Sequence, residues 1–292
     1  MINAQLVKEL REITGAGMMD CKRALVETNG NIEEAVTWLR EKGIAKAAKK
    51  SDRIAAEGIV TYEQKDNKAI VFELNSETDF VAKNQLFLDI ASEIANVLIN
   101  SSASNDEEAL NVEAGGVKVS EMVVNATAKI GEKISLRRFH AFHKTNTQYF
   151  GIYSHMQGKI VALTLLEGGS EEVARNVSMH IAAMNPKYLN VASVDQDYIE
   201  KEKAILTQEA LNEGKPANIV EKMVVGRVQK YLKEICLENQ LFVKDQEQTV
   251  EQYVKANKGK IVNYLRLEVG EGIEKRKDDF AAEVMAATCG CK

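Results

Sequence analysis

Apolar residues at helical spacing predict three short helices at the start of the chain. Their apolar faces carry Leu6, Leu10 and Ile13, then Cys21, Ala24 and Leu25, then Ile32, Ala35, Val36 and Leu39. Glycines within residues 14–17 end the first helix, and Asn31 followed by Glu34 is an N-terminal capping pattern for the third. We assign residues 1–42 to this helical module. The basic, alanine-rich residues 43–57 are interpreted as a linker rather than as a nucleic-acid-binding segment.

A pattern of strand, turn, strand, corner and helix follows, and it occurs twice. The first copy reads GIVTYEQKDNKAIVFELNSETDFVAKNQLF, and the second, later in the chain, reads GIYSHMQGKIVALTLLEGGSEEVARN. The segment Val81-Ala82-Lys83-Asn84 corresponds to Val173-Ala174-Arg175-Asn176. Two ββα units predict an α+β fold with two related core subdomains, in which a helix covers one face of each antiparallel sheet. We place these subdomains at residues 58–140 and 141–276.

The two copies differ most at the corner between the second strand and the helix. The first has Ser-Glu-Thr-Asp-Phe at 76–80, before a helix expected to open at Val81, whereas the second has Gly-Gly-Ser-Glu-Glu at 168–172. Strand-to-helix corners usually carry small polar residues. If the fold required an apolar residue there for packing, both copies would have one. The pattern therefore favours an exposed, functional Phe80 over a core residue.

Further strands and helices are predicted in the rest of the chain. Residues 128–142 and 260–275 have the alternation of strands. The segment of about 195–238 predicts two helices, each of about seventeen residues and ~25 Å, that form an antiparallel hairpin joined at Glu213-Gly214-Lys215-Pro216. Such an arm either packs on its own domain or reaches a partner. Residues 277–292 are expected to form a C-terminal module with one short helix.

Composition and charge narrow the classes of function. A chain of 292 residues is long enough for two or three compact units. Its formal net charge of −5 argues against a broad nucleic-acid-binding face, which needs clustered Lys and Arg. Apolar stretches stay short of the ~20 residues that span a membrane, and the N-terminus does not resemble a signal peptide. Four scattered cysteines argue against a disulfide framework, so a reducing cytoplasm is expected.

The histidines do not form a recognisable reactive group. His140 and His143 are three apart in an apparent strand, so they are expected on opposite faces. His180, within an apolar helix, is interpreted as a hydrogen-bonded, partly buried residue. His155 is expected to be exposed near a hairpin turn, where a polar contact is a simpler role than general base catalysis. We find no nucleotide-binding glycine motif either, and predict a protein that is not an enzyme and uses no metal or cofactor.

The cysteines have simple structural interpretations, whereas two roles remain open for the pair Met18 and Met19. Cys21 is predicted to lie in the core of the helical module, and Cys289-Gly290-Cys291 offers too few thiols for a zinc site, so a frayed tail is the simpler interpretation. Met18 and Met19 follow a glycine stop. They suit either an adaptable apolar contact surface or core packing.

Three long motifs, in order along the chain, resemble the signatures of the elongation factor Ts family. They are TGAGMMDCKRAL at 14–25, ELNSETDFVAK at 73–83 and RLEVGEGIEK at 266–275. This resemblance implies a guanine-nucleotide exchange factor in translation elongation, whose partner is the GTPase elongation factor Tu. It also implies that the first module is similar to a ubiquitin-associated domain, that the ββα units are the two core subdomains, and that the hairpin is a coiled-coil arm.

The resemblance further implies roles for single residues. Thr78, Asp79, Phe80 and Val81 would form the exchange element, in which Phe80 wedges between two helices of the GTPase and Asp79 helps to displace Mg²⁺. Contacts with the partner are implied for Arg11, Met18, Met19, Lys22, Ile130, Gly131, His155 and Val243. Lys244 stands where the family pattern has methionine, and the tail Cys289-Gly290-Cys291-Lys292 lies outside that pattern. The hairpin is also a candidate surface for a homodimer.

Two other classes of function are weighed against exchange. An adaptor built on the first module is one, although an adaptor has no evident need for the Thr-Asp-Phe corner. A hydrolase using Cys21 or His155 is the other, and it lacks a partnered base and an orienting acid in the sequence. Exchange is therefore the leading hypothesis.

Overall fold

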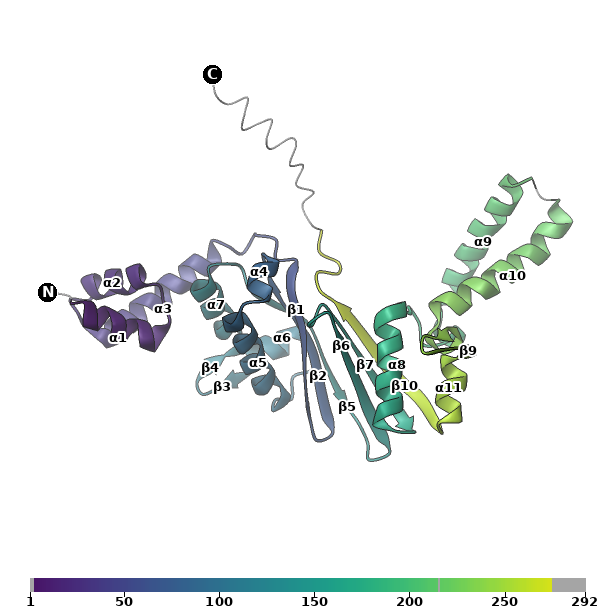
Figure 1. The fold of residues 1–292 in the computed structure, drawn as a ribbon. Helices are drawn as coiled ribbons and strands as arrows, with labels where there is room; N and C mark the ends of the chain where they lie inside the picture. Colours follow the sequence, from purple (N-terminus) through teal and green to yellow (C-terminus); the bar gives the residue numbers. More distant parts are fainter. Residues whose placement is uncertain (1–2, 215, 275–292) are drawn as a thin grey trace, which may run out of the picture. The chain divides into compact units, whose positions relative to one another are not determined.

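The computed structural model describes residues 3–214 and 216–274, and its internal contacts divide the chain into two compact units. The first unit holds the chain up to Glu63, Ile70–Ala141 and the stretch from Val269; the second holds Gln64–Ala69 and Phe142–Glu268. Helices and antiparallel strands occur in both, which confirms the predicted α+β class (Figure 1).

Three helices open the first unit. They are α1 (Ala4–Thr14), α2 (Met18–Glu27) and α3 (Ile32–Ala48). The side chains of Asn3 and Asn31 cap α1 and α3, and Gly15, with φ +64°, ends α1 in the left-handed conformation. A small core of Val7, Leu10, Cys21, Ala24, Leu25 and Ala35 joins the three helices. Cys21 is therefore a core residue, as predicted.

The third helix extends beyond the end predicted for it. Residues 43–48, assigned to a linker from the sequence, continue α3 as far as Ala48. Alanine and lysine are good helix formers, and one glycine does not stop a helix that packs on a neighbour. A Cβ atom on Gly43 would lie 3.1 Å from the Cβ atom of Ala128, so this glycine permits close approach to α7.

The core of the first unit is a three-stranded sheet with helices on one face. Its strands are β1 (Glu57–Lys65), β2 (Lys68–Ser76) and β5 (Ser135–His143), in the order β1-β2-β5. Buried residues of β2 and β5 pack with α5 (Gln85–Ile99) and α7 (Val119–Ile130). The shorter elements are α4 (Asp79–Ala82), α6 (Asp106–Asn111), β3 (Glu113–Ala114) and β4 (Val117–Lys118). Residues 128–130 were predicted to begin a strand. They are instead the last residues of α7, which continues until Gly131 ends it in the left-handed conformation.

The second unit repeats this arrangement. Its sheet has the order β10-β7-β6, formed by β6 (Gln148–His155), β7 (Ile160–Gly168) and β10 (Gly259–Glu268). Helix α8 (Glu171–Met184) lies over β6 and β7 (Figure 1). A Cβ atom on Gly151 would come within 2.0 Å of the Ala174 carbonyl carbon, so only glycine lets α8 approach β6 this closely. The shorter elements are η1 (Val191–Ser193), η2 (Leu237–Asn239), β8 (Leu241–Phe242), β9 (Asp245–Thr249) and α11 (Val250–Ala256).

Two helices occupy the segment for which a helical hairpin was predicted. Its helices are α9 (Gln196–Asn212) and α10 (Ala217–Ile235), which contact each other along their length (Figure 1). At one end the hydroxyl groups of Tyr198 and Tyr231 are 2.5 Å apart, and near the other Arg227 pairs with Glu213. The predicted C-terminal module at 277–292 lies outside the described residues.

Candidate functional site at the corner after β2

The corner after β2 is a separate single turn of helix. Thr78 caps α4, with its hydroxyl oxygen accepting from the Val81 N–H at 3.4 Å. The sequence predicted one continuous helix from Val81, but the chain breaks after α4 and starts again at Gln85. The break has a local cause, because the Asn84 side chain accepts from the Leu86 N–H at 2.9 Å and so caps a new helix.

Phe80 stands on this turn with its ring in solvent. Its side chain is 83% exposed, whereas Ala82 is buried and Val81 packs against the core of the unit. The predicted exposure of Phe80 is therefore confirmed. Burying a phenylalanine side chain contributes about 2 kcal/mol, and the isolated chain leaves that free energy unused.

Asp79 occupies the exposed side of the same turn. Its carboxylate pairs with Lys83 at 2.7 Å, and both side chains remain largely accessible to water. An exposed pair at this spacing stabilises a helix by only about 0.3–0.5 kcal/mol. The ion pair with Lys83 therefore contributes little to the stability of the turn.

A carboxylate from a distant loop holds the backbone of the corner. Glu132 Oε2 accepts from the backbone N–H groups of Glu77 and Thr78 at 3.1 and 3.0 Å, and Oε1 accepts from the Thr78 hydroxyl at 2.7 Å. In return, Glu77 Oε1 accepts from the Lys133 N–H at 2.6 Å. Sequence reasoning did not identify Glu132. The one available signal was its place directly after Ile130 and Gly131, to which the resemblance gave a contact.

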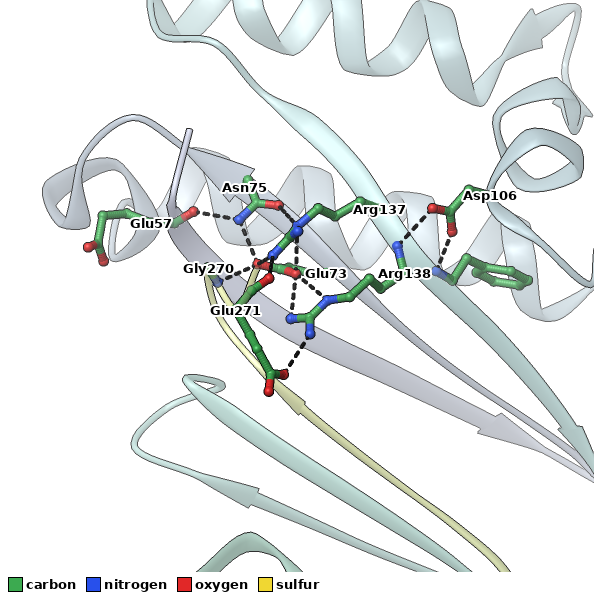
Figure 2. Close-up of polar contacts among 9 residues, drawn as sticks. Glu57, Glu73, Asn75, Asp106, Arg137, Arg138, Gly270 and Glu271 are labelled. Carbon is green, nitrogen blue, oxygen red and sulfur yellow. Dashed lines mark hydrogen bonds and ion pairs between the residues drawn. The ribbon is translucent and has the colours of Figure 1, made fainter. Parts of the chain in front are cut away.

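A buried ionic network fixes the strands behind the corner. Glu73 on β2 has no exposed surface, and its carboxylate pairs with Arg137 at 2.9 Å and Arg138 at 2.7 Å, both from β5. It also accepts from Asn75 Nδ2 and from the Gly270 N–H, each at 2.7 Å. Figure 2 shows these groups converging on one carboxylate.

The same two arginines reach the segment that follows β10. Arg138 pairs with the Glu271 carboxylate at 2.9 Å, and Arg137 donates to the Glu271 carbonyl oxygen at 2.7 Å (Figure 2). Asp106 accepts from the N–H groups of Arg138 and Phe139, at 3.0 and 2.5 Å. The ion pairs that Glu73 and Glu271 make with these arginines, without Asp106, connect β2, β5 and residues 270–271, so the end of the strand that leads into the corner is held in place.

The residues predicted for docking in the helical module are all accessible. Arg11 and Lys22 are exposed, and the side chains of Met18 and Met19 are 59% and 68% exposed. This exposure favours the contact-surface interpretation of the two methionines over core packing. Together the four residues flank the glycine turn between α1 and α2.

Ile130 and Gly131 lie beside the clamped corner. Ile130 packs half-buried against the core of the first unit, and Gly131, with φ +90°, ends α7. The Gly131 carbonyl oxygen accepts from Lys50 Nζ. Because Glu132 follows directly, the structure brings this pair together with the Thr78 corner through one loop.

His155 and Val243 belong to the second unit. His155 is exposed at the end of β6, where its Nδ1 atom lies 3.4 Å from the Tyr153 hydroxyl. Val243 is 40% exposed, and the neighbouring Lys244 donates from Nζ to the Asn176 side chain at 3.0 Å. Lys244 thus makes a polar contact with helix α8.

His180 is a buried structural histidine, as predicted. Its Nδ1 atom accepts from the Val243 N–H at 3.1 Å, so Nε2 carries the proton and donates to Gln240 Oε1 at 2.8 Å. Burial lowers the pKa of His180, and the hydrogen bond to Gln240 offsets this only in part. A neutral imidazole with both nitrogens engaged is suited to packing rather than to proton transfer.

The described residues contain no group of three His, Cys, Asp or Glu side chains placed to hold a metal ion. The cysteine-containing tail lies outside those residues. None of the described helices is long and apolar enough to cross a membrane.

A known protein family matches the part of the chain that contains the corner. The family model described as Elongation factor TS covers residues 77–271, which is well over half of the sequence. The match begins at Glu77, the first clamped residue of the corner, and ends at Glu271 in the ionic network. Proteins of this kind are nucleotide exchange factors for elongation factor Tu in protein biosynthesis, not enzymes in the usual sense. The chain therefore belongs to the elongation factor Ts family.

Proposed function

We propose that this protein binds elongation factor Tu in its GDP form and accelerates GDP release through the corner Thr78–Val81. Phe80 enters between two helices of the GTPase domain, and Asp79 disturbs the polar groups that hold Mg²⁺. The observation that carries the proposal is Phe80, a residue 83% exposed on a short turn whose preceding backbone N–H groups are hydrogen-bonded to Glu132.

The energetics of Phe80 suit a wedge. Insertion of the ring into an apolar gap would recover about 2 kcal/mol of hydrophobic free energy that folding leaves unused. That free energy can distort the partner only if the corner itself keeps its conformation. The hydrogen bonds to Glu132 and the fixed end of β2 support that stiffness.

Asp79 acts on the charge that retains the nucleotide. A Mg²⁺ ion that bridges two phosphate oxygens is a large local charge, so its displacement weakens GDP binding sharply. The ion pair of Asp79 with Lys83 is exposed and weak, so its loss on docking would cost little free energy. By linkage, GDP must lower the affinity of the factor for the GTPase by the same ratio as the factor lowers the affinity for GDP.

The remaining contacts hold the two proteins together. The ubiquitin-associated-like helical module docks through Arg11, Met18, Met19 and Lys22. Beside the corner, the partner is contacted by Ile130 and Gly131. The second unit contributes contacts from His155 and Val243. Several separate docking points raise the effective concentration of the corner at the GTPase. A homodimer formed by the helical hairpin and a cytoplasmic location stay predictions.

The test is the release rate of a fluorescent GDP analogue from purified elongation factor Tu at fixed Mg²⁺ concentration. The wild-type protein is expected to accelerate release strongly, and Phe80→Ala to reduce that acceleration by about thirtyfold, which corresponds to the loss of about 2 kcal/mol. Tyr62→Ala, which removes an exposed aromatic ring from β1, is the matched control and should keep the activity.

Two results would contradict the proposal. One is tight binding of the wild-type protein without acceleration, which would make it a holding partner only. The other is full acceleration by a folded Phe80→Ala protein.

A further inference from the structure

We infer that Glu132 is a positioning residue for exchange: it holds the Thr78 corner in the orientation from which Phe80 and Asp79 act. The inference rests on the proposed function and adds to it a residue outside the corner. Its basis is the geometry of one carboxylate that binds two consecutive backbone N–H groups and a hydroxyl group.

The Thr78 hydroxyl group connects Glu132 to α4 through two hydrogen bonds, one to each. A hydroxyl group has one hydrogen, and here it is donated to Glu132 Oε1 at 2.7 Å. The oxygen lone pairs therefore remain for the Val81 N–H, which is the capping hydrogen bond of α4. Glu132 thus fixes both the backbone before the turn and the cap that starts it.

The loop that carries Glu132 is itself held in place. Lys133 donates from Nζ to the carbonyl oxygens of Ser51 and Arg53, at 2.5 and 2.9 Å. Arg53 pairs with Glu77 at 3.2 Å, and Lys50 binds the Gly131 carbonyl oxygen. These contacts tie residues 131–133 to residues 50–53, so the loop provides a fixed support for the corner.

The corner needs an external support because it is short. Helix α4 has four residues, fewer than a helical segment needs to be stable alone. The exposed Phe80 ring has little packing of its own to define its direction, so the backbone of the turn defines it. Without Glu132, the N–H groups of Glu77 and Thr78 lose their acceptor and the turn can reorient while the core beneath it stays folded.

Asp106 provides a matched control within the same unit. Its carboxylate also accepts from two consecutive N–H groups, those of Arg138 and Phe139, but these lie at β5 and not at the corner. Removal of either carboxylate costs two backbone hydrogen bonds. Only removal of Glu132 should change the orientation of Phe80.

The experiment measures GDP release from elongation factor Tu over a range of factor concentrations, which separates the maximal rate from the half-saturating concentration. Glu132→Ala is expected to lower the maximal rate by about tenfold, since small misplacements of an acting group are costly. The half-saturating concentration should stay close to the wild-type value, because the other docking points are intact. Asp106→Ala should lower the melting temperature by about as much as Glu132→Ala does, but should keep the maximal rate.

Conservative variants separate geometry from charge. Glu132→Gln keeps the length and the acceptor oxygen, and its amide N–H can donate to the Thr78 oxygen, so it should restore most of the maximal rate. Glu132→Asp keeps the charge but is one methylene shorter, so it should not. If Glu132→Ala fails to fold, the contrast between these two variants decides the question.

The outcomes distinguish this inference from the proposed function. Equal loss of maximal rate in Glu132→Ala and Asp106→Ala would show a general framework role and overturn the inference. A wild-type maximal rate in Glu132→Ala, with Phe80→Ala inactive, would overturn the inference and leave the proposed function in place. A wild-type protein without any acceleration, or full acceleration by a folded Phe80→Ala protein, would remove both.

Discussion

The corner after β2 and the corner after β7 occupy equivalent places in the two ββα units. Residues 68–76 of β2 align with 160–168 of β7, so Thr78 corresponds to Ser170. Both residues cap the helix that follows, by accepting from the N–H groups of Val81 and Val173. The first corner continues with Asp-Phe and exposes an aromatic ring, whereas the second continues with Glu-Glu and begins a helix of 14 residues.

A single additional residue accounts for the different helices. Val81 and Ile90 are nine positions apart, and the corresponding Val173 and Ile181 are eight positions apart (90 − 81 against 181 − 173). One extra residue rotates a helical face by about 100°, so a continuous helix could not keep both apolar residues on the core. The first copy breaks its helix at Asn84 instead, and the one-turn platform for Phe80 is the result.

The two corners are also held in place by different means. Gly168 and Gly169 adopt φ of +68° and +70°, and a Cβ atom on Gly168 would lie 2.6 Å from the Lys258 carbonyl oxygen. The second corner is thus packed directly on its neighbouring backbone. The first is held through hydrogen bonds to Glu132, and it exposes Phe80. A close-packed turn and a clamped turn can therefore share one topology and differ in what they display.

The largest expected effect comes from giving the first corner the residues of the second. The double variant Asp79→Glu/Phe80→Glu should lose the acceleration of GDP release by about a hundredfold or more, because it removes the wedge and adds a charge that would be costly to bury. The release assay with labelled GDP measures this. As a control, Glu172→Phe in the second corner should leave the rate unchanged. A double variant that retained half of the activity would show that the corner does not carry exchange.

A smaller effect, on stability, is expected at the base of the corner. Glu73 aligns with the buried Leu165 of β7, so Glu73→Leu makes the first strand like the second. The variant should lower the free energy of unfolding by about 3 kcal/mol, because Arg137 and Arg138 lose the carboxylate between them. Urea unfolding gives the value.

The triple variant Glu73→Leu/Arg137→Met/Arg138→Met sharpens this test. It removes the charges together with their partner, so it should recover part of the lost stability. If Glu73→Leu alone had wild-type stability, the network would have no part in fixing the end of β2.

The comparison also shows which features of the site are encoded locally. The strands, the helical hairpin and the exposure of Phe80 follow from alternation, spacing and turn residues that are neighbours in the sequence. The break at Asn84 was readable from the one-residue offset between the copies, although the apolar pattern alone suggested one helix. Glu132 was not readable, because a glutamate in a loop has the same local pattern whether it is solvated or binds a segment 54 positions away. The partners of Glu73 on β5 and beyond β10 were hidden for the same reason.

The smallest expected effect concerns His180, which aligns with the exposed Asp89 of the first copy. Burial lowers the pKa of His180, so the folded state holds it neutral while the unfolded chain protonates near the ordinary value of about 6.5. Its contribution to stability is therefore complete above that value and is lost as the pH falls through it towards the folded pKa. His140 on β5 also has a pKa lowered by burial, so the wild-type protein should lose stability at low pH through both residues.

The variant His180→Asn separates the two histidines. An asparagine oxygen can still accept from the Val243 N–H, but it does not titrate. Urea unfolding at pH 7 and pH 5 should therefore show a smaller loss of stability in His180→Asn than in the wild type, with the remainder attributable to His140 and the carboxylates. An unchanged difference between the two pH values would mean that His180 is protonated without cost in the folded state. In that case its hydrogen bonds to Val243 and Gln240 would have to rearrange, since a doubly protonated ring can no longer accept from a backbone N–H.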